Sequence, residues 1–263
     1  MATEMIRGTR IYLAAIHGWH KQIGAERISQ ARCLEANYYL REASDADVRL
    51  MMSGREFLLD SGAFTYIGQM SRGKNMKIDW SGYVDDFIAF INKWRVKQFF
   101  ELDIEAIVGL KRVEEFTERI TQETGRKPIP VWHKGRGIKY WKYMVENYDY
   151  VAIGGFVGRI PDIKRNEYDH IRKMVNYARQ RGVRVHGLGF TSSKWLPKIK
   201  FYSVDSTSWN NSCRFGECHI FNGTEIKRRN KRSEGKRGNH LKLLNVCFDE
   251  WIKYAEYAEN GFQ

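Results

Sequence analysis

Two aspartates stand at the ends of short apolar runs in this chain, and their type and placement fit glycosidic chemistry. Asp60 ends the run EFLLD, and Asp205 ends the run FYSVD. One carboxylate of such a pair can attack a sugar while the other moves a proton. A single Asp after a strand is as often only a helix N-cap, so the interpretation depends on several such residues meeting in one place.

Further polar residues and glycines follow the same pattern. Asp103 ends QFFELD, His133 ends IPVWH, Gly154-Gly155 end YVAIGG, and His186 opens the turn HGLG. Glycines at such positions let a flat ligand approach the backbone. The set therefore predicts one site in which carboxylates, imidazoles and main-chain groups surround a planar molecule.

Eight β-type runs, spaced along the whole chain, could position these residues. They are IYLAAI (11–16), EFLLD (56–60), QFFELD (98–103), IPVWH (129–133), YVAIGG (150–155), VRVHGLG (183–189), FYSVD (201–205) and CHIFNG (218–223). Most are apolar without strict alternation, which is typical of parallel strands buried on both faces.

Helical patterns lie between several of these runs. Apolar residues recur at helical spacing in Tyr83–Val96, in Asn166–Arg181 and in a last segment, His240–Asn260. Strand alternating with helix predicts an α/β fold, a (β/α)8 TIM barrel forming a single domain over the whole chain. The stretch His17–Arg55 is longer than one helix needs, so we expect a long insertion after strand 1 that carries an extra helix or lid.

The composition fits an ordered protein of the cytoplasm. Of the 263 residues, 43% are hydrophobic and 14% aromatic, which argues against disorder. The sequence has neither a signal-peptide pattern nor an apolar run long enough to span a membrane. Four irregularly spaced cysteines do not form a disulfide scaffold, and in the cytoplasm they stay reduced.

The net charge of +13 favours a polyanionic partner. Part of the excess is concentrated in the run KRRNKRSEGKR (227–237), which we expect to be a loop that grips phosphates. The expected nucleic-acid-binding residues are Lys227, Arg228, Arg229, Lys231, Arg232, Lys236 and Arg237.

Taken in order, the strand-end motifs resemble those of the tRNA-guanine transglycosylase family, including its DNA-acting 7-deazaguanine branch of phage type. The resemblance runs from residue 56 to 209 and rests on DSGAF (60–64), LD (102–103), VWH (131–133), IGGFVG (153–158), HGLG (186–189) and SVDS (203–206). DSGAF is similar to the family's Asp-Ser-Gly-Gly-aromatic motif, and SVDS matches the strand end that carries its nucleophile.

The resemblance implies exchange of a nucleobase through a covalent glycosyl–enzyme intermediate, without a redox cofactor. Asp205 is then the nucleophile, Asp60 takes the proton of the incoming base, and Asp103 accepts both N–H donors on the guanine edge. Phe64 and His186 are expected to sandwich the ring. The full set of expected base-binding residues is Asp103, Ser61, Phe64, His133, Gly154, Gly155 and His186.

The chain departs from the tRNA-acting members where they carry a zinc subdomain with a Cys-x-Cys-x2-Cys…His pattern. It has only Cys213, Cys218 and His219 at irregular spacing, so no metal is expected and a structural zinc there is the alternative. The missing subdomain and the basic run favour DNA over tRNA. Arg159, which stands where tRNA-acting relatives have an acidic residue, favours preQ0 as the free 7-deazaguanine base.

Three other functions stay open. A minimal member could exchange guanine in tRNA. For each of these functions the expected location is the cytoplasm, which is that of the host if the chain is phage-encoded. The chain could instead be a non-catalytic nucleic-acid-binding barrel that uses its basic run and rim aromatics. A glycoside hydrolase also places two carboxylates on a barrel rim, but the basic charge argues against a neutral sugar substrate.

Overall fold

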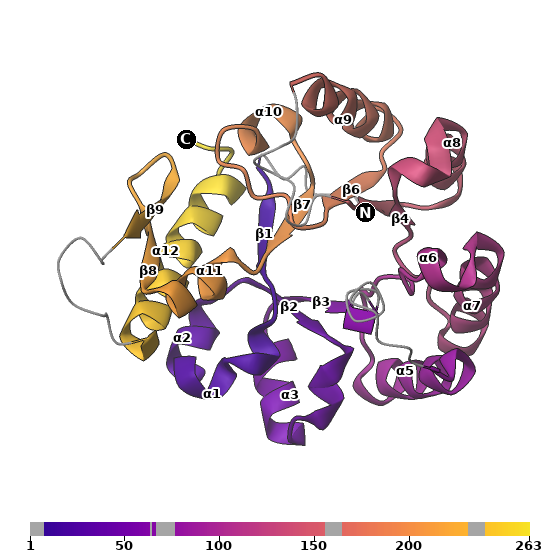
Figure 1. Ribbon diagram of the computed structural model, residues 1–263, viewed down its shortest axis with the longest axis horizontal. Coiled ribbons are helices and arrows are strands. Elements are labelled where there is room, and N and C mark those ends of the chain that lie inside the picture. The colour runs from indigo at the N-terminus through magenta and orange to yellow at the C-terminus, as the bar shows by residue number, and fades with distance from the viewer. Residues whose placement is uncertain (1–7, 64, 67–76, 156–164, 231–239) are drawn as a thin grey trace.

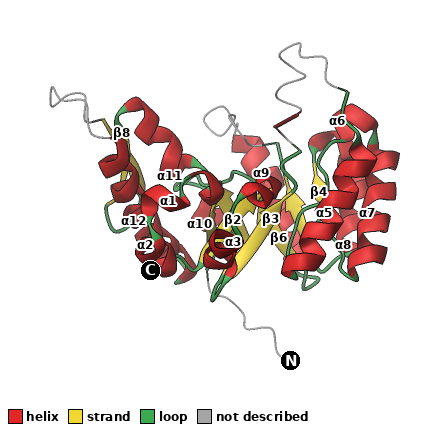
Figure 2. Ribbon diagram, turned by 90° about the horizontal axis from the view of Figure 1, so that it is seen from below, coloured by secondary structure: helices red, strands yellow, loops and turns green. Residues whose placement is uncertain are grey.

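The computed structural model describes residues 8–63, 65–66, 77–155, 165–230 and 240–263. A curled parallel sheet of seven strands lies at its centre, with helices around it (Figures 1 and 2). The order across the sheet is β3-β2-β1-β7-β6-β5-β4. These strands are β1 (Arg10–Leu13), β2 (Cys33–Asn37), β3 (Glu56–Asp60), β4 (Val131–Trp132), β5 (Tyr150–Ile153), β6 (Arg184–Gly187) and β7 (Ser203–Ser206).

The expected helices are confirmed, with their ends shifted by a few residues. Tyr83–Val96, Asn166–Arg181 and His240–Asn260 correspond to α5 (Trp80–Trp94), α9 (Arg165–Arg179) and α12 (His240–Glu259). The other helices are α1 (His20–Ile23), α2 (Ala25–Gln30), α3 (Asp45–Met52), α6 (Glu105–Val108), α7 (Leu110–Thr124), α8 (Gly137–Asn147), α10 (Leu196–Ile199) and α11 (Ser208–Asn211), with 3₁₀ turns at Ile16–Gly18, Tyr38–Glu42, Lys134–Arg136 and Ser212–Phe215. Within the described ranges, none of the helices is both long and apolar enough to cross a membrane.

Alternate residues of the strands face two different cores, which explains why the runs are apolar on both faces. Residues such as Ile11, Leu59 and Val151 belong to the large cluster that packs under the helices. Their neighbours Tyr12 and Leu58 belong to a second, smaller cluster on the other face of the sheet. The residues that end the strands on this second face are therefore the ones that can meet.

The predicted strand at 98–103 is reduced to a bridging segment between the two edges of the sheet. Phe99 pairs in parallel with Leu59 of β3, and Phe100 pairs in parallel with Ile129, just before β4. The Phe100 amide donates to the Leu59 carbonyl at 3.0 Å, and the Ile129 amide donates to the Phe99 carbonyl at 2.8 Å. This segment thus touches both edge strands.

The prediction of a long insertion after strand 1 was wrong. The stretch from His17 to Arg55 contains α1 to α3 and also β2, which lies between β1 and β3 and pairs with β3 along its whole length, from Cys33–Glu56 to Asn37–Asp60. The pattern was missed because the strand is only five residues long and carries polar side chains at alternate positions.

The assignment of 218–223 as the eighth strand was also wrong. β8 (Glu217–Phe221) pairs antiparallel with β9 (Ile226–Asn230) in a separate two-stranded sheet that packs on α12, at one side of the molecule (Figure 1). Asn222 forms the turn by accepting the amides of Thr224 and Glu225. The first part of the expected basic loop is therefore a strand, while 231–239 lies outside the described residues.

Candidate active site

Four strands bring acidic and imidazole side chains together at the carboxyl end of the sheet. Glu35 comes from β2, Asp60 from β3, His186 from β6 and Asp205 from β7. In a parallel sheet all strands finish at the same end of the sheet, which is why residues far apart in sequence converge there. Asp60 and Asp205 both lie at this end of the sheet, and the Asp205 charge is one of the causes that raise the pKa of Asp60.

Asp205 is held firmly in place by neighbouring strand ends. Its side chain is almost buried, and its Oδ1 accepts the Gly189 backbone N–H at 2.6 Å. The same oxygen lies 3.2 Å from Nε2 of His186. A carboxylate with fixed donors on one oxygen presents the other in a defined direction, as a nucleophile requires.

His186 lies below the rim and supports Asp205. It is fully buried, and its Nδ1 lies 2.7 Å from Ser203 Oγ, which in turn bonds to the Tyr150 hydroxyl. If each group donates once, the Tyr150 hydroxyl donates to Ser203 Oγ, the Ser203 hydroxyl donates to His186 Nδ1, and His186 Nε2–H donates to Asp205. This position favours orientation of the carboxylate over the stacking role expected from the sequence, because a base cannot reach a fully buried ring.

Glu35 is a member of the site that the sequence did not reveal. Its side chain is 6% exposed, and its Oε2 has no hydrogen-bond partner within the part of the chain that the structure describes. Burial and the nearby Asp205 and Asp60 carboxyls raise the pKa of Glu35 well above its usual range. The available signal was an acid directly between the apolar residues Leu34 and Ala36.

Glu35, His186 and Asp205 are also the residues that could hold a metal ion. Within the described ranges they form the one group of three potential ligands, with one atom of each lying within 4.8 Å of the others. Two carboxylates and an imidazole suit a divalent transition metal. In the structure, however, Asp205 and His186 are bonded to one another and to Gly189 and Ser203.

Asp60 is suited to carry a proton near neutral pH. Burial is the main cause that raises its pKa to about 6, and the Asp205 and Asp103 charges add to it, while hydrogen bonds from the Gly62 and Ser61 amides oppose the rise. The Ser61 carbonyl accepts the Tyr83 hydroxyl of α5, which fixes the turn. Phe64, the expected stacking residue, lies outside the described residues.

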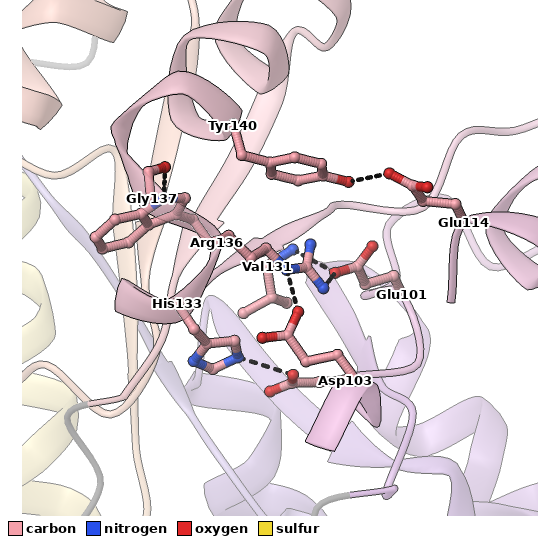
Figure 3. A network of polar contacts seen from close by, with 10 residues as sticks. Glu101, Asp103, Glu114, Val131, His133, Arg136, Gly137 and Tyr140 are labelled. Atoms are coloured by element: carbon pink, nitrogen blue, oxygen red, sulfur yellow. Dashed lines mark hydrogen bonds and ion pairs between the residues drawn. The ribbon is translucent and has the colours of Figure 1, made fainter. Parts of the chain in front are cut away.

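Asp103 and His133 form a pair at the neighbouring strand ends, where Figure 3 shows the two side chains pointing toward each other. His133 Nε2 lies 2.7 Å from Asp103 Oδ1, and both side chains are partly exposed. Burial lowers the pKa of His133, but the hydrogen bond and charge of Asp103, with Glu105, outweigh it and raise the pKa. The expected base-reading carboxylate therefore already has an imidazole partner.

A buried ion-pair network, also missed at the sequence level, supports this pair (Figure 3). Arg136, with a side chain 1% exposed, lies 2.8 Å from Glu101 and also bonds to Glu105. Glu101 accepts the Val131 amide at 2.9 Å, so it ties β4 to the segment that ends in Asp103. Burial raises the pKa of Glu101 to about 7 against the opposing effects of Arg136 and of the Val131 amide.

The glycine pair after β5 is shaped around His133. A Cβ on Gly154 would lie 2.5 Å from His133 Cε1 and 3.1 Å from a methyl of Val131, so only glycine fits beside the ring. Gly155 is exposed and has a φ of 89°, a backbone conformation that favours glycine. Both glycines thus lie beside His133, the partner of Asp103.

The cysteines named as a zinc alternative pack inside the protein. Cys213 Sγ lies 3.4 Å from Cys247 Sγ, and the His219 amide donates to Cys247. The His219 ring is instead bonded to Ser212, and Cys218 is buried. The hydrogen bond from Cys213, with those from His219 and Ser212, lowers the pKa of Cys247 to about 5 against the effect of burial.

Of the predicted nucleic-acid-binding residues, those that the structure describes lie on β9 of the β8–β9 hairpin. Lys227 pairs with Glu225 at 2.8 Å, and Arg228 pairs with Glu217. Arg229 lies on the same strand, whereas the other predicted contacts, Lys231, Arg232, Lys236 and Arg237, lie outside the described residues.

Comparison with known proteins relates the chain to others by fold alone. No family model and no curated protein matches it. Among solved structures, it is similar to a Coccidioides immitis protein assigned as a fructose-1,6-biphosphate aldolase, with a TM-score of 0.53 and 10% identity over 97% of this chain and 90% of that one. The mixed α/β architecture is therefore shared, and the function has to be argued from the site.

Proposed function

We propose that this chain is a DNA-guanine transglycosylase that exchanges guanine in DNA for a 7-deazaguanine base, with preQ0 as the expected base. The observation that carries the proposal is the meeting of Asp60, Asp103 and Asp205, which lie close enough for the last two to raise the pKa of Asp60. Three carboxyls allow three separate tasks, namely attack on the sugar, proton transfer and recognition of the base.

In the first step an Asp205 oxygen forms a bond to the sugar C1′ while the C1′–N9 bond breaks. The electron pair goes to N9 of the departing guanine, and protonated Asp60 supplies the proton. In the second step Asp60 takes the N9 proton of the incoming base, whose N9 attacks C1′ and displaces Asp205. A pKa of about 6 suits Asp60 to both transfers near neutral pH.

Asp103 is the proposed base-reading residue. A carboxylate accepts the two adjacent N–H donors on the guanine edge, and both guanine and 7-deazaguanine bases carry them. His133 holds one Asp103 oxygen in place, and the exposed Gly155 amide lies beside this pair. The same contacts serve the departing and the incoming base.

The fold proposed for this enzyme is a complete (β/α)8 barrel in one domain, with Phe99–Phe100 as its eighth strand. Parallel bridges from this segment to Leu59 and Ile129 support the proposal. The nucleic acid is proposed to contact the basic hairpin, and the target base must leave its stack to reach carboxyls at the strand ends.

The test is incubation of the purified chain with guanine-labelled DNA and free preQ0, with labelled tRNA in parallel. We expect release of guanine from DNA by the wild type and none by Asp205→Ala. Asp149→Asn is the matched control, because Asp149 precedes β5 at the opposite end of the sheet and pairs there with Arg184. Exchange in tRNA alone would assign the substrate to tRNA, and DNA binding without exchange would favour a non-catalytic barrel.

A further inference from the structure

The interior of the site contains a carboxyl that the proposed reaction does not use. Glu35 lies on β2, where Leu34 and Ala36 belong to the core under the helices while Cys33 belongs to the opposite core. By alternation Glu35 faces the same side as Cys33. Its Oε2 is buried and, among the described residues, meets no hydrogen-bond partner.

The charged surroundings of Glu35 are acidic. The titratable groups around it are Asp60 from β3, His186 from β6 and Asp205 from β7. In the part of the chain that the structure describes, neither Lys nor Arg forms an ion pair with any of the three carboxyls. Glu35 and Asp205 place carboxyl oxygens within 4.8 Å of one another. Two buried carboxyls at this separation ionise together only if a cation compensates them; otherwise one of them holds a proton.

A proton fits the geometry better than a metal ion. Asp205 Oδ1 already accepts from Gly189 at 2.6 Å and lies 3.2 Å from His186 Nε2, so two of the three possible ligands are engaged with protein partners. A metal ion would have to displace these bonds. A proton needs only the free Oε2 of Glu35.

We propose that Glu35 and Asp205 share one proton, which Glu35 carries in the free protein, and that Glu35 is a positioning residue for the nucleophile. Glu35 then leaves Asp205 as the single anion of the buried pair and offers it an O–H donor. The role in positioning rests on the proposed function, whereas the shared proton does not.

The proton is tested first without any activity measurement. Because Glu101 has a pKa of about 7, the spectrum is recorded in a Glu101→Gln background labelled with ¹³C at the glutamate carboxyls. We expect a carboxyl resonance at the protonated shift at pH 7 that is lost when Glu35→Gln is added. A background spectrum in which every glutamate is ionised at pH 7 overturns the proposal, whatever the activity of the protein.

Unfolding in urea provides a second test. A carboxyl whose pKa is raised by folding stabilises the protein below its unfolded pKa, and this stability is lost as pH rises toward the folded pKa. Glu35→Gln should therefore raise the urea midpoint at pH 8 and change it little at pH 5. The matched control Glu105→Gln removes an ion pair with the buried Arg136 and should lower the midpoint at both pH values. A fall in the Glu35→Gln midpoint at pH 8 contradicts the proposal.

Base exchange tests the positioning role. Gln is neutral and keeps a donor, so Glu35→Gln should retain exchange within about threefold, while Glu35→Leu should lose at least about tenfold, the effect of one hydrogen bond to a charged group. Equal losses in both variants would show that the ionised form is needed. Calorimetric titration with Mn²⁺ and Zn²⁺ completes the test, because binding by the wild type that Glu35→Gln abolishes would assign a metal site instead.

Discussion

His133 Nε2 lies 2.7 Å from Asp103 Oδ1, so an imidazole already holds the residue proposed to read the base. The pair joins the end of β4 to the end of the segment that bridges the sheet edges, and the buried Arg136 lies behind it. On the proposed function, recognition of the base therefore depends on Asp103 together with His133 rather than on one carboxylate.

Asp103→Asn should lower the pKa of His133. Burial alone lowers it, and the Asp103 hydrogen bond and charge are the main causes that reverse the shift. In the wild type we expect the imidazole to titrate above its ordinary value of about 6.5, and below it in the variant. The stability that the pair adds is present at low pH and is lost as pH rises through the His133 pKa. The measurement is an NMR titration of the imidazole, and an unchanged midpoint would contradict the pairing.

Gly154→Ala should weaken binding of the free base while leaving the fold intact. The added Cβ would lie 2.5 Å from His133 Cε1, so the ring must move away from Asp103. We expect KM for the base to rise by about tenfold, the loss of about 1.4 kcal/mol. Gly135→Ala is the matched control, because a Cβ there meets nothing within 4 Å. Equal KM values in the two variants would remove His133 from the proposed site.

Guanine release by the wild type should fall as pH rises above about 6, where the Asp60 carboxyl that supplies the proton in the first step is ionised. In Asp60→Asn we expect kcat to fall about 10²- to 10⁴-fold, the usual contribution of a general acid–base group, and this limb of the pH profile to disappear. A variant that keeps the same limb would show that another group titrates there.

Arg136→Met should destabilise the protein by about 3–5 kcal/mol in urea unfolding at pH 7, because it leaves Glu101 and Glu105 without their buried partner. The loss should be smaller at pH 5, where Glu101, with a pKa of about 7, is protonated in the folded state. The control Arg112→Met removes an exposed pair with Glu115 and should cost less than about 1 kcal/mol.

Replacement of Lys227 by Ala should weaken DNA binding about equally for all sequences. If Lys227 contacts one phosphate, the slope of log K against log salt concentration should become shallower by about 0.7–0.9. Lys139→Ala, on the distant helix α8, is the control for net charge. An unchanged slope would place the nucleic acid elsewhere on the surface.

The strand ends could be predicted because each catalytic candidate follows a run buried on both faces. Asp60 and Asp205 were placed in this way, and both lie at the carboxyl end of the sheet. Glu35 was not, because five residues with alternating polar side chains do not distinguish a strand from a loop. The roles of these residues are not decided by their positions and depend on the experiments above.

Contacts between residues far apart in the sequence were the other feature that the sequence did not predict. The run at 218–223 has the composition of a buried strand, but composition does not state its partner, and β8 pairs with β9 rather than with β1. Likewise, nothing in the sequence distinguishes Arg136 from the exposed basic residues. Its burial follows from Glu101 and Glu105, which lie about thirty residues earlier in the chain.

The narrow contact made by Phe99 and Phe100 has a mechanical consequence. The Asp103–His133 pair lies toward β4, and Glu35 and Asp60 lie toward β3. The short connection between these two groups consists of the pairs Leu59–Phe99 and Phe100–Ile129. The longer route passes through β5, β6, β7, β1 and β2, each paired in parallel with the next. Local opening concentrates where pairing is short, so amides along this seam should exchange faster than those of the five-residue β2–β3 ladder. On the proposed function, small movements at this seam admit and release the base while Asp205 stays fixed.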